Sequence, residues 1–511
     1  MFFRSEEKFS VRKRSIAINA GSSVIQIIAN AFMLLFLYKF LLATIGVSRV
    51  GIWSLVIATT PIVRIGNLGM AGSLVRYVAK YDALTDMSSI SSAVQTAVLS
   101  GGLSSLLFMI LAYPAAKIYL HILVPHGLYG ISVQILPYVF IGHWISMVTT
   151  NFQAVLYGFQ LISQKNIILT CDSIAYVMTS VLAVPIYGLI GLVICRLSVY
   201  CITLCATLIV LRKQLPFLPL VPRIWDKRSF KEMIRYSVNY QTIVLLGVLY
   251  DPVTKGLLSR FGSVSMVGYF EMANKVVQQM SSLFVNAYQV LVPAFANLKE
   301  VEPGAIAAAY LNSYRLLFYI SLPVYSACAI AMPMVSVVLT GSYQPLFVWS
   351  GVILLGGWFF NTLGIPACAV CLGIGEMRWN VISYFVMAIA NLFLGLMFAK
   401  IWGGFGVVGA WAISLAVGGM IQNISYNLKS RIGLRELFPA SSRPLALFSL
   451  LGFMAGYAVC HKTSAFCRES IANGLMISCF ALAIAIPLWV HPSRKEFLIC
   501  LSMIVPKKSG P

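Results

Sequence analysis

The sequence predicts an all-α polytopic membrane protein of about 14 transmembrane helices, arranged as two six-helix bundles plus two C-terminal helices. Three observations support this fold class. Of the 511 residues, 59% are hydrophobic and only 10% are charged, whereas soluble domains carry about 25% charged residues. Apolar segments long enough to cross a bilayer, which takes about 20 residues, recur along the whole chain. Most basic residues of the connecting loops also lie in every second loop, and therefore on one side of the membrane, as the positive-inside rule requires.

The apolar runs define the predicted spans. The first run is too long for a signal-peptide core and no small-residue cleavage site follows it, so it is expected to remain as a span. Several runs approach 30 residues and must tilt or extend beyond the hydrocarbon. The predicted spans lie near residues 15–42, 48–70, 91–115, 131–157, 165–187, 188–211, 232–255, 264–295, 308–339, 345–372, 377–400, 404–428, 444–461 and 470–490.

Loop charge tests this division of the chain and orients it. An even number of spans places both termini on one side, and that side then holds 24 Lys and Arg residues against 8 on the other. The largest cluster lies between spans six and seven, where Arg212, Lys213, Arg223, Lys227, Arg228 and Lys231 follow one another. Because cytoplasmic loops collect Lys and Arg, both termini are expected in the cytoplasm. The net charge of +22 is thereby explained without a nucleic-acid partner.

An internal repeat divides the chain into two halves. The sequences Val50-Gly51-Ile52-Trp53 and Val267-Gly268-Tyr269-Phe270 open spans two and eight, and glycine-rich turns link spans five to six and eleven to twelve. An even number of spans per half gives parallel repeats, an arrangement typical of alternating-access transporters. Three pairs of glycines share nearly one offset: Gly51–Gly268 at 217 residues, Gly158–Gly373 at 215 and Gly188–Gly403 at 215.

The predicted domains follow from this repeat. Residues 1–211 form an N-terminal six-helix lobe, and 232–429 form a C-terminal six-helix lobe. A proline-containing cytoplasmic linker, 212–231, joins them. Residues 430–511 supply two additional helices and a cytoplasmic tail.

Several motifs that carry chemistry in other proteins are excluded by their context. Residues 404–409 match GxGxxG, but they join two apolar helices and no acidic residue follows, so a dinucleotide site is not expected. Cys368 and Cys371 sit at the end of an apolar run, where cysteine usually behaves as a small apolar residue. The five histidines are scattered along the chain. The sequence therefore predicts no metal site, no catalytic residues and no enzyme activity.

Charged residues inside the spans are the candidate functional residues, because ionisable groups at membrane depth usually face a water-filled cavity. The candidate cations of a cationic, substrate-binding cavity are Arg64, Lys275, Arg315 and Arg196; the candidate acids for ion coupling are Asp172, Asp251 and Glu271. Arg196 can instead pair with Asp172, and Glu271 can pair with Lys275 four residues on. Arg64 and Arg315 have no evident local partner. An excess of intramembrane cations favours an anionic cargo such as a phosphate, which arginine holds bidentately.

Three segments resemble a known transporter group. They are Gly66–Met70 followed by Leu74–Tyr77, the run Val267–Lys275, and the glycine-rich hairpin at 401–409. With twelve plus two spans, the chain resembles the Wzx-type flippases of lipid-linked oligosaccharides, members of the multidrug/oligosaccharidyl-lipid/polysaccharide (MOP) exporter superfamily. The resemblance covers about residues 10–430. Asn67 departs from it, because many relatives carry an acid there.

The resemblance implies alternating access between two bundles. The expected cargo is an undecaprenyl-pyrophosphate-linked oligosaccharide, moved from the cytoplasmic to the outer face of a bacterial inner membrane for O-antigen or capsule-type polysaccharide. Expected partners are this substrate and membrane lipids, with a polysaccharide polymerase and a chain-length regulator as candidates. No cofactor is expected beyond a coupling ion, H⁺ or Na⁺.

Three alternatives stay open. A cation-coupled multidrug antiporter of the same superfamily would need buried acids, for which only Asp172, Asp251 and Glu271 are available. A lipid II flippase is a close relative, but its first-span arginine pattern is absent, since residues 15–36 contain no Arg. A membrane-embedded glycosyltransferase or polymerase would need a large polar outer loop, which the sequence lacks. The sugar and the oligomeric state are not determined by the sequence.

Overall fold

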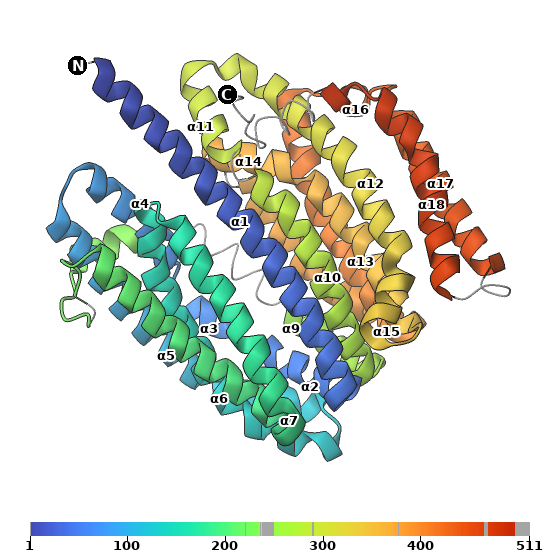
Figure 1. The fold of residues 1–511 in the computed structure, drawn as a ribbon, viewed down its shortest axis with the longest axis horizontal. Coiled ribbons are helices and arrows are strands. Elements are labelled where there is room, and N and C mark those ends of the chain that lie inside the picture. The colour runs from blue at the N-terminus through green and yellow to red at the C-terminus, as the bar shows by residue number, and fades with distance from the viewer. Residues whose placement is uncertain are drawn as a thin grey trace, which may run out of the picture. The chain divides into compact units, whose positions relative to one another are not determined.

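The computed structural model describes residues 2–219, 221–235, 237, 250–288, 291–376, 378–463 and 469–495. Helices and short turns make up these residues, with no strand among them, which confirms the all-α fold class (Figure 1). The elements are α1 Phe2–Ile45, α2 Val47–Ala58, α3 Pro61–Gly66, α4 Met70–Ala83, α5 Met87–Leu123, α6 His126–Gly158, α7 Ile162–Gln214, α9 Tyr250–Phe261, α10 Val264–Tyr288, α11 Leu291–Val301, a short 3₁₀ turn at Pro303–Ala305, α12 Ile306–Thr340, α13 Pro345–Leu363, α14 Ile365–Ile374, α15 Arg378–Ser430, α16 Leu434–Leu437, α17 Ser442–Thr463 and α18 Glu469–Val490.

Most predicted spans have a helical counterpart. Among the described residues, eight helical segments are long and apolar enough to cross a membrane. Two of them, α7 and α15, have 53 residues each and each corresponds to two predicted spans. The predicted span at 232–255 lies mostly outside the described residues. The chain is therefore a multi-pass membrane protein.

The bends in α7 and α15 support the internal repeat. Gly188 in α7 has φ 56° and ψ −134°, and Gly403 in α15 has φ 57° and ψ −139°. This region of backbone space is open essentially to glycine alone. The two halves thus share an unusual conformation at the spacing that the sequence repeat gives. A second equivalent pair, Gln160 and Gly375, also shares positive φ, at 59° and 82°.

Unit 1 comprises Met1–Gly268. In it, α1 packs along α7, α7 packs on α6, and α5 packs on α6 and α4. Its apolar core joins buried side chains of these helices, including Leu74 of α4, Ile90 of α5 and Val155 of α6. The bundle thereby holds both arms of α7 in fixed positions, which matters for the polar residues they carry.

Unit 2 comprises Tyr269–Pro511. Here α13 packs along α15, and α17 pairs with α18 and rests on α12. The two additional helices are fixed by polar contacts near their ends: the Tyr319 hydroxyl of α12 donates to the Leu488 carbonyl at 2.9 Å, and His491 Nε2 lies 3.0 Å from Ser442 Oγ. His491 also stacks on the Tyr319 ring. These contacts anchor α17 and α18 to the rest of unit 2.

The division into units differs from the predicted lobes. The predicted linker at 212–231 would end the first lobe, but unit 1 continues to Gly268 because α9 packs on α2 and α5. The Tyr119 hydroxyl of α5 donates to the Pro252 carbonyl at 2.8 Å, and Ser259 Oγ donates to the Leu123 carbonyl at 2.5 Å. The lobe boundaries themselves remain a prediction.

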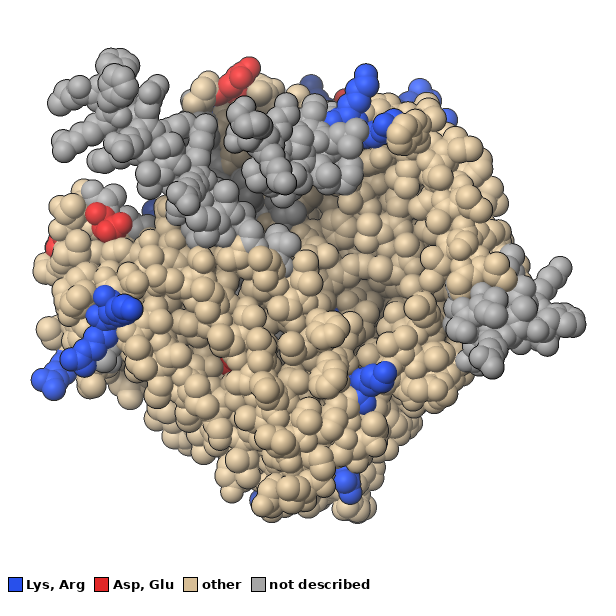
Figure 2. Space-filling view, viewed as in Figure 1, with Lys and Arg blue, Asp and Glu red and all other residues tan. Residues whose placement is uncertain are grey.

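The surface is consistent with a lipid solvent. On the face shown in Figure 2, charged side chains are few and most of the described surface is uncharged. Large apolar side chains are exposed on most long helices, for example Leu182 at 74% and Leu482 at 77%. In water, contiguous apolar exposure of this extent would drive association.

Candidate functional site

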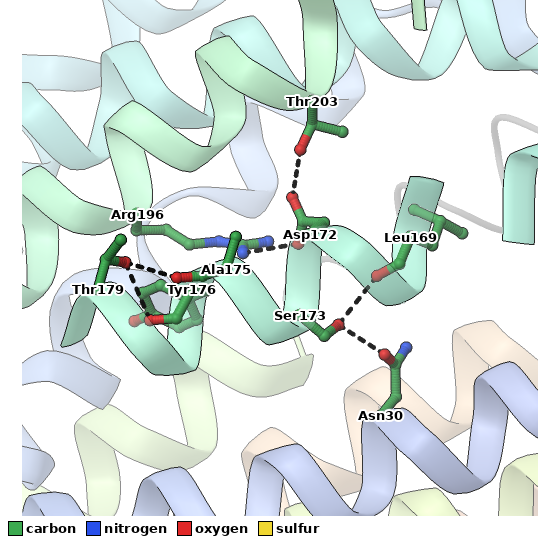
Figure 3. Close-up of polar contacts among 9 residues, drawn as sticks. All are labelled: Asn30, Leu169, Asp172, Ser173, Ala175, Tyr176, Thr179, Arg196 and Thr203. Atoms are coloured by element: carbon green, nitrogen blue, oxygen red, sulfur yellow. Dashed lines mark hydrogen bonds and ion pairs between the residues drawn. The ribbon is translucent and has the colours of Figure 1, made fainter. Parts of the chain in front are cut away.

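A polar cluster lies between the two arms of α7 in unit 1. Arg196 NH1 lies 2.8 Å from Asp172 Oδ2, and Thr203 Oγ1 donates to Asp172 Oδ1 at 2.7 Å (Figure 3). Thr203 lies about as far past the Gly188 bend as Asp172 lies before it. The bend therefore brings residues of two predicted spans to one height, and both carboxylate oxygens of Asp172 have partners.

Aromatic rings complete the surroundings of Arg196. Its guanidinium lies 4.1 Å from the Tyr200 ring centroid and 4.7 Å from that of Tyr176. Cation–π contacts of this kind contribute about 0.5–2 kcal/mol, more when water is excluded. The Arg196 side chain is 25% exposed and that of Asp172 is 10% exposed. Arg196 is thus held by an ion pair and two rings, rather than free to bind a ligand with all its donors.

A second polar contact joins α1 to the same level of α7. Ser173 Oγ donates to Asn30 Oδ1 at 2.6 Å and also contacts the Leu169 carbonyl (Figure 3). Ser173 directly follows Asp172 in the chain. The cluster therefore involves residues of α1 as well as both arms of α7.

His143 of α6 borders this cluster. Its ring packs edge-on against Tyr200, with centroids 6.1 Å apart, and its Nδ1 lies 3.1 Å from the Val139 carbonyl. The positive charges of Arg64 and Arg196 both act on it. His143 is thus a further ionisable group beside the cluster.

Arg64 is the least constrained of the candidate cations in unit 1. It lies in α3, a six-residue helix that begins at Pro61. Its side chain is exposed and forms no hydrogen bond or ion pair with the part of the chain that the structure describes. Its donors are therefore available to a bound anion.

Lys275 of α10 is the corresponding candidate in unit 2. Its Nζ lies 3.8 Å from Glu271 Oε1 and 3.5 Å from Gln278 Oε1. The Glu271 side chain is 3% exposed, whereas that of Lys275 is 36% exposed. The predicted pair is therefore present but long, and the ammonium group retains access to its surroundings.

Arg315 has a partner, although not a local one. Its Nε and NH2 both donate to the Glu436 carbonyl, at 3.0 and 2.6 Å. The partner is a backbone group that is distant in sequence, so no charge pattern could reveal it. Arg315 fastens α12 to α16, and a substrate would have to compete for its donors.

Asp251 and Lys255 of α9 form a further ion pair. The separation of Lys255 Nζ from Asp251 Oδ2 is 3.0 Å. Lys255 is 1% exposed and Asp251 37%. The structure therefore brings together Arg196 with Asp172, Lys275 with Glu271, and Lys255 with Asp251, and leaves Arg64 apart from these pairs.

The starts of α2 and α10 meet in a reciprocal contact within unit 1. A Cβ on Gly51 would lie 2.0 Å from the Val264 carbonyl oxygen, and a Cβ on Gly268 would lie 2.6 Å from that of Val47. Ser48 and Ser265, also 217 residues apart, share a hydrogen bond of 3.0 Å. Equivalent residues of the repeat thus contact one another in pairs, as they do across a two-fold axis. Only glycine permits this backbone approach.

Sequence reasoning missed several residues of the cluster. Tyr176, Tyr200, Thr203 and Asn30 were not among the candidates, because tyrosines and neutral polar residues are common in spans. Their spacing offered a signal: Asp172 and Tyr176, and Arg196 and Tyr200, lie four apart, so each pair shares one helix face. Among the described residues, no group of His, Cys, Asp and Glu side chains could hold a metal ion.

Solved structures with a similar fold are membrane transporters. The chain matches a lipid II flippase, MurJ, in an inward closed conformation with TM-score 0.73, 11% identity, and coverage of 94% of this chain and 99% of that one. It matches an inward-facing multidrug resistance MATE family transporter of the MOP superfamily with TM-score 0.66, 14% identity, and coverage of 80% and 98%. A MOP superfamily transporter from Pyrococcus furiosus gives TM-score 0.55, 14% identity, and coverage of 81% and 93%. At these identities the likeness establishes the fold.

The sequence itself identifies the family. No curated protein sequence matches the chain significantly. A family model described as polysaccharide biosynthesis protein matches residues 45–348, which is more than half of the chain. The chain therefore belongs to this polysaccharide biosynthesis protein family and has the fold of the MOP superfamily transporters.

Proposed function

We propose that this protein is an alternating-access flippase for undecaprenyl-pyrophosphate-linked oligosaccharides. It would move the lipid-linked units from the cytoplasmic to the outer face of a bacterial inner membrane, for O-antigen or capsule-type polysaccharide. Membership of a polysaccharide biosynthesis family and a fold shared with a lipid II flippase support this proposal. Both termini would be cytoplasmic, as the loop charges predict.

The observation that carries the proposal is the exposed Arg64 side chain, which has no hydrogen bond or ion pair with any residue that the structure describes. A bare arginine at membrane depth costs roughly 2.5–3.5 kcal/mol on the insertion scale, so an exposed one without an ion-pair partner needs a compensating role. Arg64 would bind the pyrophosphate bidentately. Lys275 of unit 2, whose ion pair with Glu271 is 3.8 Å long, is a further candidate cation for an anionic cargo. Arg196 and Arg315 would instead hold the helices in place.

Ion coupling is the second part of the proposal. Asp172 would be the coupling acid, since its protonation would release the guanidinium of Arg196 and change the packing of the two arms of α7. Asp251 and Glu271 are the other candidate acids. The coupling ion would be H⁺ or Na⁺. A polysaccharide polymerase and a chain-length regulator remain candidate partners.

A multidrug antiporter of the same fold is the competing function. Asp172, the most suitable acid for a cationic drug, already has Arg196 at 2.8 Å. A drug cation would have to displace this arginine. The occupied carboxylate thus supports the flippase proposal over drug export.

Export in cells tests the function. Deleting the gene should leave lipid-linked units on the cytoplasmic face and abolish surface polysaccharide, and the wild-type gene should restore it. Arg64→Ala should prevent this restoration, while Arg64→Lys should restore it in part, because lysine keeps the charge but not the bidentate geometry. Normal surface polysaccharide in the deletion strain would refute the function. Full restoration by Arg64→Ala would refute only the role of this residue.

A further inference from the structure

The chain segment between α7 and the next helix is not a loose connection. We call residues 215–231 the linker segment; residue 220 lies outside the described part, and residues 227–231 already belong to the helix that follows. Its Leu215 and Leu218 are buried in the apolar core of unit 1, at 8% and 7% exposure. One side of the linker segment is therefore fastened to the membrane-spanning bundle.

Side chains of α5 bind three backbone N–H groups of the linker segment. Pro216, Pro219 and Pro222 have no N–H group. The N–H groups of Arg223 and Ile224 both donate to Gln95 Oε1 of α5, at 2.9 and 3.1 Å. That of Asp226 donates to Thr96 Oγ1 at 3.0 Å. Gln95 is 3% exposed and Thr96 is fully buried, so two buried side chains of α5 serve to hold this backbone.

These bonds between backbone N–H groups and α5 side chains are informative, because a backbone group in bulk water bonds to water and needs no side-chain partner. Where water is scarce, each unsatisfied group costs several kcal/mol, and an irregular stretch persists only if protein groups replace the water. In the linker segment, three prolines lack the donor and side chains of α5 accept from three further N–H groups. The backbone chemistry thus indicates a position at the edge of the hydrocarbon rather than in bulk water.

The outer side of the linker segment combines large apolar side chains with cations. Phe217, Val221, Ile224 and Trp225 are exposed at 39%, 65%, 57% and 50%. The Trp225 ring also donates through Nε1 to Ser100 Oγ at 2.9 Å, so its orientation is fixed. Tryptophan with one polar contact and an exposed ring is typical of the membrane–water interface. The exposed basic residues in and next to the segment are Arg212, Lys213, Arg223, Lys227, Arg228 and Lys231.

Acidic residues in this region are engaged locally. Asp226 accepts from the Ser229 N–H at 2.8 Å and the Arg228 N–H at 3.2 Å, and so caps the helix that follows. Glu232 pairs with Arg228 at 3.3 Å. Among the described residues, none of the other five cations forms an ion pair, although Lys227 and Lys231 adjoin Asp226 and Glu232 in the sequence. The segment therefore presents net positive charge beside exposed apolar surface.

We propose that the linker segment is an interfacial anchor that binds anionic phospholipids. Its apolar side chains would enter the acyl-chain boundary, and its cations would bind the phosphate headgroups of the same leaflet. Basic residues next to an anionic leaflet each contribute roughly a fivefold gain in binding. This inference does not depend on which cargo the protein carries.

Quenching of Trp225 fluorescence by brominated lipids tests the proposal. The full-length protein is placed in vesicles that carry bromine either on phosphatidylglycerol or on phosphatidylcholine, at equal bromine content. The contribution of Trp225 is the difference between wild type and Trp225→Phe. We expect this contribution to be quenched in both vesicles, and several-fold more when bromine is on phosphatidylglycerol.

Charge variants separate the two parts of the proposal. Combining Arg223→Gln, Lys227→Gln and Lys231→Gln should abolish the preference for phosphatidylglycerol and keep the quenching itself. The matched control neutralises three exposed arginines of unit 2, Arg378, Arg431 and Arg435, and should leave the preference unchanged. Absence of quenching by either lipid would place the segment in water, or against a protein partner, and overturn the proposal. Equal quenching by both lipids in the wild type would overturn its anionic part.

Discussion

Replacing Gly51 by alanine tests whether the contact between the starts of α2 and α10 closes one conformation of the transporter. The new Cβ would lie 2.0 Å from the Val264 carbonyl oxygen and 3.0 Å from its carbon. Carbon and oxygen need about 3.2 Å, so one backbone must move by about 1 Å. Overpacking of this kind costs about 1–3 kcal/mol.

This cost falls only on the conformation in which α2 and α10 touch. If the flippase alternates with a conformation in which they are apart, 1–3 kcal/mol shifts the equilibrium toward that conformation by about 5–150-fold. Gly268→Ala should act in the same direction, because its Cβ would lie 2.6 Å from the Val47 carbonyl oxygen. Reciprocal positions of a two-fold contact should give matching effects.

Reactivity of a cysteine at position 48 measures the shift. Ser48→Cys would lie in the closed contact, opposite Ser265, and a membrane-impermeant maleimide should label it only when the contact opens. Mass spectrometry of the peptide that contains residue 48 distinguishes it from the native cysteines. Labelling should increase when Gly51→Ala is added. The double variant Ser48→Cys and Ser265→Cys, whose parent oxygens are 3.0 Å apart, should form a disulfide that stops export until it is reduced.

The controls are alanine substitutions at Gly72 and Gly409, where an added Cβ would meet nothing within 4 Å. They should change neither labelling nor export. Wild-type labelling and wild-type export in both Gly51→Ala and Gly268→Ala, at normal protein levels, would refute the reasoning. Export that continues unchanged with the disulfide formed would show that this contact does not open during transport.

Three further predictions concern the architecture. Asp172→Asn should lower the free energy of unfolding of the purified protein by about 1–3 kcal/mol, because it leaves Arg196 partly buried without a counter-ion. Adding Arg196→Gln should recover part of the loss. Purely additive effects in this double-mutant cycle would show no coupling between the two residues. Gly188→Ala and Gly403→Ala should each cost about 1–3 kcal/mol, since alanine strains at these dihedral angles; equal melting temperatures of variants and wild type would contradict this. Burial lowers the pKa of His491 below its usual 6.5, so the folded protein favours the neutral ring. The contribution of His491 to the free energy of unfolding is therefore complete above pH 6.5 and declines as the pH falls toward the folded-state pKa. Hydrogen exchange in α17 and α18 should rise over that pH range in the wild type but not in His491→Gln.

The sequence determined the class of fold and the repeat. Composition and the length of the apolar runs require a lipid solvent, because no soluble core of this size could bury so much apolar surface. The glycines at 188 and 403 marked equivalent bends, because the backbone region they occupy is open to glycine alone. Loop charge tested the division into spans and predicted their orientation, since the Lys and Arg content of each loop is a property of the local sequence.

The candidate site was predictable only in part. Intramembrane charge singled out Arg64, Asp251 and the pair Glu271–Lys275, whose members are four residues apart on one helix. Arg196 with Asp172 was inferred as an option between neighbouring spans. The tyrosines that flank this pair were not singled out, because aromatic residues serve many purposes in spans.

Only the tertiary structure decided the roles of the remaining charges and glycines. Arg315 binds the backbone carbonyl of Glu436, and sequence carries no signature of a carbonyl as a partner, because every residue has one. In the sequence, Gly51 and Gly268 only mark the starts of spans two and eight. In the fold, each of them lies against the backbone of the other's segment. Whether a charged side chain is free or engaged depends on groups that are distant along the chain and near in space. Only the packing of the helices determines which groups these are.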